Sequence, residues 1–255
     1  MDLKDSVVAI TGGGSGLGAA TAQAFISAGA NVAIEDLPAS SGAGLAQELG
    51  NQALFAAANV TSESEVAQAL DTIKAKWGTV HVAINCAGIS NIRRLISKQG
   101  PHSLRAFSRI IEVNLIGTFN VMRLAASQMA TNEPNLDGER GVIVNTSSVA
   151  AVEGAIGQVA YAASKGGVMA MTLPAARDLA SLGIRVCAIA PGIFDTPMFA
   201  TVSEDAHQAL ESQIPFPRRL GRPEEFAALA RHIVENPMLN GETIRLDGAL
   251  HVPPR

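Results

Sequence analysis

The sequence predicts an α/β protein built as one domain on a doubly wound parallel β-sheet. Short runs of β-branched residues alternate with longer helical patterns along the 255 residues, which is typical of βαβ units with right-handed crossovers. Hydrophobic residues make up 47% of the chain and aromatic residues only 4%. This composition favours strands of Val, Ile and Ala that are covered by helices on both faces. No repeat and no Gly/Ser-rich linker divides the chain, so we expect a single domain over residues 1–255.

The strands are predicted where short apolar runs lie between turn signals. The first run reads VVAIT and the fifth reads GVIVN, and such unbroken apolar runs are typical of strands buried between two helical layers. The seven predicted strands cover residues 7–11, 31–35, part of 52–60, 80–85, 141–145, 184–190 and 243–246.

The predicted helices connect these strands. Thr61 or Ser62 is the expected N-cap of the helix after the third strand. Pro174 lies inside a later helix and is expected to bend or interrupt it. A polar loop over residues 132–140 precedes the fifth strand. The predicted helices cover residues 16–28, 61–76, 104–130, 158–182 and 224–235.

Charge and hydropathy exclude several classes of partner. The formal net charge is −4 and the chain contains no run of basic residues, so neither nucleic acid nor an acidic membrane surface is an expected partner. The apolar runs are broken within about ten residues, too short to span a bilayer. Residues 1–6 are polar and lack the pattern of a targeting segment. We therefore predict a cytoplasmic protein that acts on a small molecule.

The cysteines and histidines indicate neither a disulfide framework nor a metal site. Cys86 and Cys187 are the only cysteines in the chain, which points to a reducing compartment. Both are expected to be small buried residues. The five histidines are scattered without the spacing of metal ligands, so we predict no catalytic metal.

A glycine-rich loop follows the first predicted strand. Residues 11–18 read TGGGSGLG, a helix is predicted directly after them, and an acid, Asp36, ends the next strand. This context is typical of a dinucleotide-binding Rossmann fold, in which glycines let the backbone approach a pyrophosphate at a helix N-terminus. The alternative is a tight turn that binds no ligand.

Asp36 indicates which dinucleotide binds. A carboxylate at this position accepts hydrogen bonds from the adenosine ribose hydroxyls and repels the 2′-phosphate of NADP. No Arg or Lys lies in residues 12–18, and Leu37 and Pro38 follow the acid. We therefore predict NAD as the cofactor. Two alternatives stay open: Asp36 caps a turn only, or the neighbouring Glu35 takes its role.

The segment YAASK indicates a site for proton transfer. Lys165 follows Tyr161 by four residues, so on a helix both side chains share one face. A free phenol has a pKa of about 10, and a nearby ammonium together with an oxidised nicotinamide ring would lower it. Ser148, just past the fifth strand, can orient a substrate oxygen, and Ser147 is its rival. An ordinary amphipathic helix with a surface lysine is the alternative.

Taken together, these motifs resemble the short-chain dehydrogenase/reductase family over nearly the whole chain. Ser148, Tyr161 and Lys165 match the spacing of its catalytic triad, and Asn114 matches the helix asparagine that supports a proton-relay water. The NCAG segment is similar to the family's NAG motif. The resemblance implies hydride transfer between NAD and a secondary alcohol or ketone, with Tyr161 as the acid/base.

The resemblance also implies a set of cofactor-binding residues. It adds the PG motif, followed by a threonine, and several residues beside the glycine-rich loop. The expected NAD site consists of Gly12, Ser15, Gly16, Leu17, Gly18, Asp36, Asn59, Val60, Asn85, Cys86, Ala87, Gly88, Tyr161, Lys165, Pro191, Gly192, Phe194 and Thr196.

Two positions depart from the family pattern. Asn59 stands where an aspartate usually holds the adenine amino group, and its amide oxygen is expected to accept that hydrogen bond with modest weakening of NAD binding. Asp195 stands where a small residue is usual, and it is expected to add a charge near the cofactor mouth.

Within the family, stretches such as NTSSVAAVEG and IAPGIFDTPM resemble a subgroup that oxidises 3-hydroxyacyl-CoA to 3-ketoacyl-CoA in fatty acid metabolism. Its animal members are mitochondrial. A hydroxysteroid or another secondary alcohol is the alternative substrate. The family habit, together with apolar residues beyond one core stripe on the long helices, implies a homotetramer.

Other functions are less consistent with the residues. Epimerases and dehydratases of this scaffold are usually longer, and ketoacyl-carrier-protein reductases usually take NADPH, which Asp36 opposes. An NAD-binding structural subunit of a larger complex is the alternative from another class. Residues 193–218 are either a lid over the substrate or a surface loop with a small core of its own, and in a lid Met198 and Phe199 could face the substrate.

Overall fold

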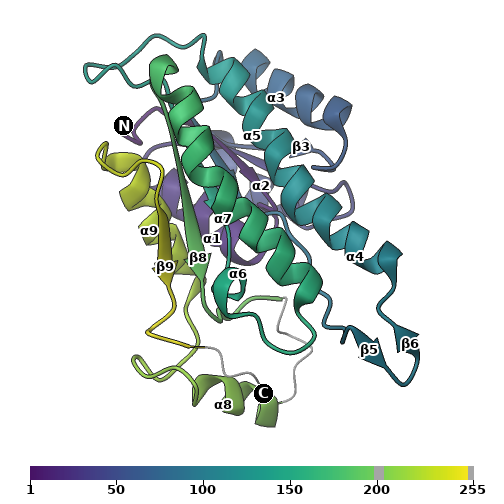
Figure 1. Cartoon of the computed structure of the whole chain (residues 1–255). Coiled ribbons are helices and arrows are strands. Elements are labelled where there is room, and N and C mark those ends of the chain that lie inside the picture. The colour runs from purple at the N-terminus through teal and green to yellow at the C-terminus, as the bar shows by residue number, and fades with distance from the viewer. Residues whose placement is uncertain (198–203, 252–255) are drawn as a thin grey trace.

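The computed structural model describes residues 1–197 and 204–251, and it contains a seven-stranded sheet in the order β3-β2-β1-β4-β7-β8-β9 (Figure 1). All six strand pairings are parallel. The strands are β1 Val7–Thr11, β2 Asn31–Asp36, β3 Ala53–Ala57, β4 Val82–Asn85, β7 Gly141–Thr146, β8 Ile184–Pro191 and β9 Thr243–Leu246. The strand order reverses between β1 and β4, and such a switch point opens a crevice at the carboxyl ends of the strands.

Helices cover both faces of this sheet (Figure 1). On one face α1, α2 and α9 pack against residues such as Val8 and Ile10, and on the other face α3, α5 and α7 pack against Val7 and Ala9. The helices are α1 Gly16–Ser27, α2 Gly42–Leu49, α3 Glu63–Trp77, α4 Leu104–Ile111, α5 Thr118–Met129, α6 Ala150–Glu153, α7 Val159–Leu179, α8 Glu204–Glu211 and α9 Pro223–Glu235. Because successive residues of a strand point to opposite faces, unbroken apolar strands fill both layers. The predicted doubly wound α/β fold is confirmed.

The expected long helix over residues 104–130 has an irregular middle. A π-helical turn, Glu112–Gly117, joins α4 to α5, and it carries the buried Asn114. π turns insert extra backbone into a helix and are frequent at functional sites. The sequence pattern did not indicate this turn.

Pro174, which is expected to bend or interrupt its helix, does not interrupt it. α7 runs from Val159 to Leu179 across this residue. A stripe of buried residues spaced by four packs the helix against the molecule on both sides of the proline: Ala160, Ser164, Val168, Thr172 and Ala176. Tertiary packing therefore outweighs the hydrogen bond that the proline cannot donate.

Several short elements were not predicted. They are α2 and α6, the hairpin of β5 Ile96–Ser97 and β6 Gly100–Pro101, and α8 inside the segment expected as a lid. Beside α8, Ile214, Leu220 and Leu250 form a small apolar cluster of their own. Met198 and Phe199 lie outside the described residues. None of the described helices is both long enough and apolar enough to cross a membrane.

Candidate active site

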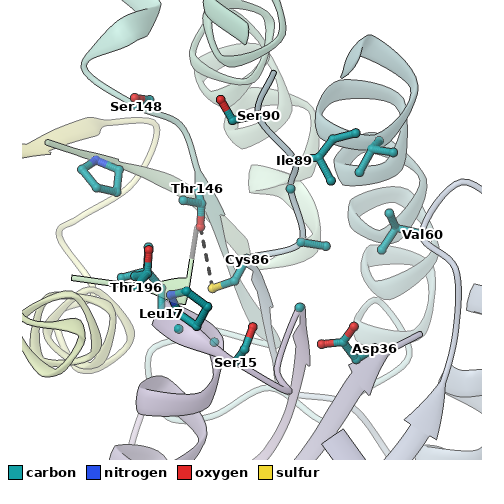
Figure 2. Close-up of a pocket in the computed structure, with 18 of the residues that line it drawn as sticks. Ser15, Leu17, Asp36, Val60, Cys86, Ile89, Ser90, Thr146, Ser148 and Thr196 are labelled. Atoms are coloured by element: carbon teal, nitrogen blue, oxygen red, sulfur yellow. Dashed lines mark hydrogen bonds between the residues drawn. The ribbon is translucent and has the colours of Figure 1, made fainter. Parts of the chain in front are cut away.

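A cavity of about 520 Å³ opens at the carboxyl ends of the central strands. Figure 2 shows Asp36 and Ser148 at opposite ends of it, with Cys86 and Thr146 between them. Nearly all the residues expected from the sequence line it: Gly12, Ser15, Gly16, Leu17, Gly18, Asp36, Asn59, Val60, Cys86, Ala87, Gly88, Ser148, Tyr161, Lys165, Pro191, Gly192, Phe194 and Thr196. The cavity therefore has one end suited to binding a nucleotide and another end suited to proton transfer.

The glycine-rich loop forms one wall of this cavity. Gly12 has φ +62°, and a Cβ added there would lie 2.8 Å from the backbone of Ala87. A Cβ on Gly14 would lie 2.9 Å from a carboxyl oxygen of Asp36. The loop leads into the N-terminus of α1, where unpaired N–H groups favour an anion. A backbone cradle that side chains would fill, beside a helix N-terminus, fits the pyrophosphate of a dinucleotide.

Asp36 and Glu35 point to different environments. The Asp36 carboxyl accepts hydrogen bonds from the backbone N–H of Gly14 at 2.9 Å and of Leu37 at 2.8 Å, and it lines the cavity. Glu35 also borders the cavity, but its side chain lies on the opposite face of β2 and is only 1% exposed. Of the two acids, only Asp36 has the partly exposed position that ribose hydroxyls need.

The proton-transfer end is built from β7 and α7. Ser148 follows β7, and its hydroxyl is a hydrogen-bond partner of the Tyr161 phenol. The Nζ atom of Lys165 lies 5.9 Å from the Tyr161 ring centroid and donates a 2.6 Å hydrogen bond to the carbonyl of Thr146. These three side chains meet as the spacing of YAASK and the strand end predicted.

Two expected residues, Asn85 and Asn114, lie behind the cavity wall and do not line it. Asn85 donates a 2.8 Å hydrogen bond to the side chain of Asn145. The Asn114 amide donates to the Ile89 carbonyl and to the Ser164 hydroxyl, and it accepts from the Ile89 N–H at 2.8 Å. Asn114 therefore ties the loop after β4 to α7.

Ser147, the rival of Ser148, also lines the cavity, but its hydroxyl is bonded to backbone. Its hydroxyl donates a 2.9 Å hydrogen bond to the carbonyl of Lys165, so it holds the backbone of α7. Asp195 is exposed and does not line the cavity, although its neighbours Phe194 and Thr196 do. The charge that we expected at the cofactor mouth therefore points into solvent.

The comparison with known proteins agrees with this geometry. Residues 6–207 match the family model of the short chain dehydrogenases. The chain belongs to the short-chain dehydrogenase family. It is an oxidoreductase that acts on secondary alcohols, and the family and enzyme class predicted from the sequence are confirmed.

Individual relatives match over nearly their full lengths. The human 3-hydroxyacyl-CoA dehydrogenase type-2 is 54% identical over 99% of this chain and 97% of its own. The crystal structure of the protein of that name from Mycobacterium avium has a TM-score of 0.94 at 42% identity and covers 100% of both chains. A 3-ketoacyl-(acyl-carrier-protein) reductase from Brucella melitensis, complexed with NADH, has a TM-score of 0.88 at 30% identity and covers 98% of this chain and 100% of its own. The family and the last of these structures indicate a nicotinamide dinucleotide as cofactor.

Burial sets the pKa values at the proton-transfer end. It raises the pKa of Tyr161 above that of a free phenol, and the hydrogen bond with Ser148 acts in the opposite direction. Burial also lowers the pKa of Lys165 to about 8. The arrangement of the chain alone therefore does not produce the acidic phenol that the sequence argument required, and a further positive charge in the cavity is needed.

Several cavity residues were not predicted. Thr146, Ile89, Ser90 and Val113 line the cavity (Figure 2 labels the first three). Thr146 also donates a 3.7 Å hydrogen bond to the Cys86 sulfur. A signal for Thr146 was present in the sequence, because it ends a predicted central strand at the carboxyl edge, where ligands bind. In the described part of the chain no group of three or more His, Cys, Asp or Glu side chains could hold a metal ion.

Replacing Glu35 with leucine is expected to stabilise the protein at alkaline pH. Burial raises the pKa of Glu35 from 4.5 to about 8. The native state therefore holds this proton more tightly than the unfolded chain, and the wild-type free energy of unfolding falls as pH rises through that window. We expect Glu35→Leu to abolish this fall, so that above pH 8 its free energy of unfolding exceeds that of the wild type by up to about 5 kcal/mol. Thermal unfolding measured from pH 5 to pH 9 checks it, and an equal difference in Tm at both ends would contradict it.

Proposed function

We propose that this enzyme interconverts 3-hydroxyacyl-CoA and 3-ketoacyl-CoA with NAD as the hydride carrier. The meeting of Ser148, Tyr161 and Lys165 at one end of a dinucleotide-shaped cavity carries the reaction type. The relatives named 3-hydroxyacyl-CoA dehydrogenase type-2, at 52–54% identity, support the acyl-CoA substrate. A hydroxysteroid is the second candidate from the sequence, and no feature of the described cavity favours it.

Each of the four catalytic side chains has its own role in the proton transfer. Tyr161 takes the proton of the substrate hydroxyl as a phenolate, and Ser148 orients the substrate oxygen by a hydrogen bond. Lys165 stabilises the phenolate by its charge and can bind ribose hydroxyls. Asn114 positions the loop at Ile89 and supports the path by which the proton returns to solvent. When bound, NAD supplies the acceptor for the hydride and, in its oxidised form, the extra positive charge that the phenol needs.

Cofactor choice is proposed to depend on Asp36. Its carboxylate lines the cavity, and Leu37 beside it offers no charge to a 2′-phosphate. We expect the double variant Asp36→Ala, Leu37→Arg to lower the ratio of kcat/KM for NADH over NADPH by about 100-fold or more, because a repulsive charge is replaced by an attractive one. Steady-state rates with each cofactor measure it, and an unchanged ratio would refute the role of Asp36. The single variant Leu37→Arg controls for the added charge.

A basic segment that leads from β4 to α4 supports a substrate that carries phosphates. Residues 86–111 contain five basic residues and no acidic one, in a protein of net charge −4, and Glu112 follows them. All five are exposed: Arg93, Arg94, Lys98, Arg105 and Arg109. Of these, Arg109 lines the cavity, and it also pairs with Glu112 at 3.0 Å. A locally basic surface on an acidic protein favours an anionic substrate such as an acyl-CoA over a neutral steroid.

The direct test is the oxidation of NADH by acetoacetyl-CoA, followed by absorbance and repeated with NADPH. Fast turnover with NADH and little with NADPH supports both the substrate class and the cofactor. Turnover of ketosteroids but not of acetoacetyl-CoA would replace the substrate. Binding of NADH without turnover of any alcohol or ketone would favour the structural-subunit alternative.

The assembly and location stay predictions of the same proposal. Exposed apolar side chains on α4, α5 and α7, including Leu104, Phe119 and Leu173, are consistent with association into a homotetramer. Sedimentation as a monomer at micromolar concentration would refute it. The cytoplasmic location is checked by fractionation of the cells that make the protein.

A further inference from the structure

Glu35 is a buried acid that the proposed reaction does not use. It ends the apolar part of β2, and only 1% of its surface is exposed. Both of its carboxyl oxygens are buried, and neither has a hydrogen-bond partner among the described residues. Buried polar groups in native proteins almost always have partners, so this carboxyl calls for one that the described chain does not supply.

The position of Glu35 places it at the nucleotide end of the cavity. Strand alternation puts its side chain on the same face of β2 as Ala33, which packs in the core beneath α3 and α5. Glu35 lines the cavity together with Val60 and Val113, which belong to the same apolar cluster. Its neighbour Asp36 is the residue proposed to bind the adenosine ribose. The adenine joined to that ribose must therefore bind close to this wall.

Asn59 is expected to accept a hydrogen bond from the adenine amino group, but its side-chain oxygen already accepts two hydrogen bonds within the protein. Its side-chain oxygen accepts hydrogen bonds from the Thr61 N–H at 3.1 Å and from the Thr61 hydroxyl at 2.9 Å. An amide oxygen has two lone pairs, and its nitrogen is only a donor. An aspartate at position 59 would keep its second carboxylate oxygen free to accept from the adenine, whereas the asparagine has no second oxygen.

We propose that Glu35 binds the exocyclic amino group of the adenine of the dinucleotide. The inference rests on the proposed NAD-dependent function and names a further residue of that same site. The amino group is the one N–H donor of the base in a dinucleotide, and a carboxyl group offers it an acceptor in either protonation state. Val60 and Val113 provide the apolar surface for the faces of the base.

Burial gives the carboxyl a second capability. It raises the pKa of Glu35 to about 8, and no charged side chain contributes to this shift. Near neutral pH the group is therefore largely protonated. A protonated carboxyl can accept from the amino group and donate to an adjacent ring nitrogen, which is the two-point pattern by which amide side chains recognise adenine. Glutamine at this position is accordingly expected to preserve recognition.

The experiment compares binding of NADH and of its reduced purine analogue, in which a hydrogen atom replaces the amino group and the base keeps no N–H donor. Dissociation constants come from the fluorescence of the reduced nicotinamide or from calorimetry, without any substrate. The wild-type protein is expected to prefer NADH by about tenfold or more, since a buried acceptor left without its donor costs that much. Glu35→Leu is expected to bind both within about twofold, and Glu35→Gln to keep the preference.

The control variant is Asn59→Ala, at the rival position. We expect it to keep the preference for NADH. If Asn59→Ala loses the preference while Glu35→Leu keeps it, the inference is overturned in favour of Asn59. Wild-type protein that binds neither dinucleotide would overturn the proposed function itself. Far-UV circular dichroism verifies folding, and Glu35→Met replaces the leucine variant if that one does not fold.

Discussion

Tyr161→Phe is expected to lower kcat by about 10³-fold or more while leaving NADH affinity within about fivefold of the wild type. The substitution removes the group that exchanges the proton, which contributes about 10² to 10⁴-fold in such reactions. Binding loses at most one hydrogen bond, about 1 kcal/mol. Steady-state kinetics and fluorescence titration with NADH measure the two quantities. Retention of near-full turnover would remove Tyr161 from the mechanism.

The mechanism behind this prediction has a direct spectroscopic test, because Tyr161 is the only tyrosine of the chain. Ultraviolet titration of the phenolate therefore reports this one residue. Burial raises its pKa in the free protein, and we expect saturating NAD⁺ to lower the midpoint. Lys165→Met is the matched variant, since it removes the ammonium 5.9 Å from the ring centroid and should raise the midpoint in the complex. A midpoint that does not respond to NAD⁺ would contradict the electrostatic account.

The second large effect is expected far from the cavity, at Arg185. Its guanidinium is 8% exposed and donates hydrogen bonds to Glu139 and to the carbonyls of Ile233, Val234 and Leu239. This one side chain therefore joins β8 to the end of α9. Arg185→Met leaves three backbone carbonyls without this donor and leaves the buried Glu139 with the terminal ammonium of Met1, 3.0 Å from Oε2, as its remaining cationic partner. Breaking such a buried network costs about 3–5 kcal/mol. We expect Tm to fall by about 10 °C.

The matched control for Arg185 is the double variant Arg185→Met, Glu139→Gln. Removal of both charges should recover only a small part of the lost stability, because Glu139 also pairs with the terminal ammonium of Met1 and Glu139→Gln removes that pair as well. Thermal unfolding of the four proteins of this cycle measures the coupling. Additive losses in Tm would show that the pair contributes no interaction of its own.

The fold and most of the cavity lining follow from local patterns in the sequence. The unbroken apolar run VVAIT and the glycine-rich loop are local patterns of neighbouring residues, so they predict β1, α1 and the cavity wall that they form. The same holds for Tyr161 and Lys165, which one helical turn brings to one face. Asp36 could be placed because a strand end fixes it beside that loop.

Features that depend on distant contacts could not be predicted in this way. The acceptor of Asn59 is engaged by Thr61, and only the geometry of the turn shows it. The pKa of Tyr161 was expected to be low from its neighbour Lys165, whereas burial raises it. Glu35 looked like an alternative to Asp36, but the alternation of the strand turns it into the protein. In each case solvent exclusion by other elements decides the chemistry.

The π-helical turn Glu112–Gly117 makes the length of this segment a constraint of its own. Each residue of a regular helix advances the side chains by about 100°, so a deleted codon elsewhere in this helix would put its two halves out of phase. A π turn holds one residue more than an α-helical turn, so loss of a single residue here would leave a regular turn and keep α4 and α5 in phase. Buried positions such as Val121 and Met129 would stay against the sheet, whereas Asn114 would lose Ile89 and Ser164. Among related proteins, an alignment gap in this turn should therefore coincide with loss of this asparagine.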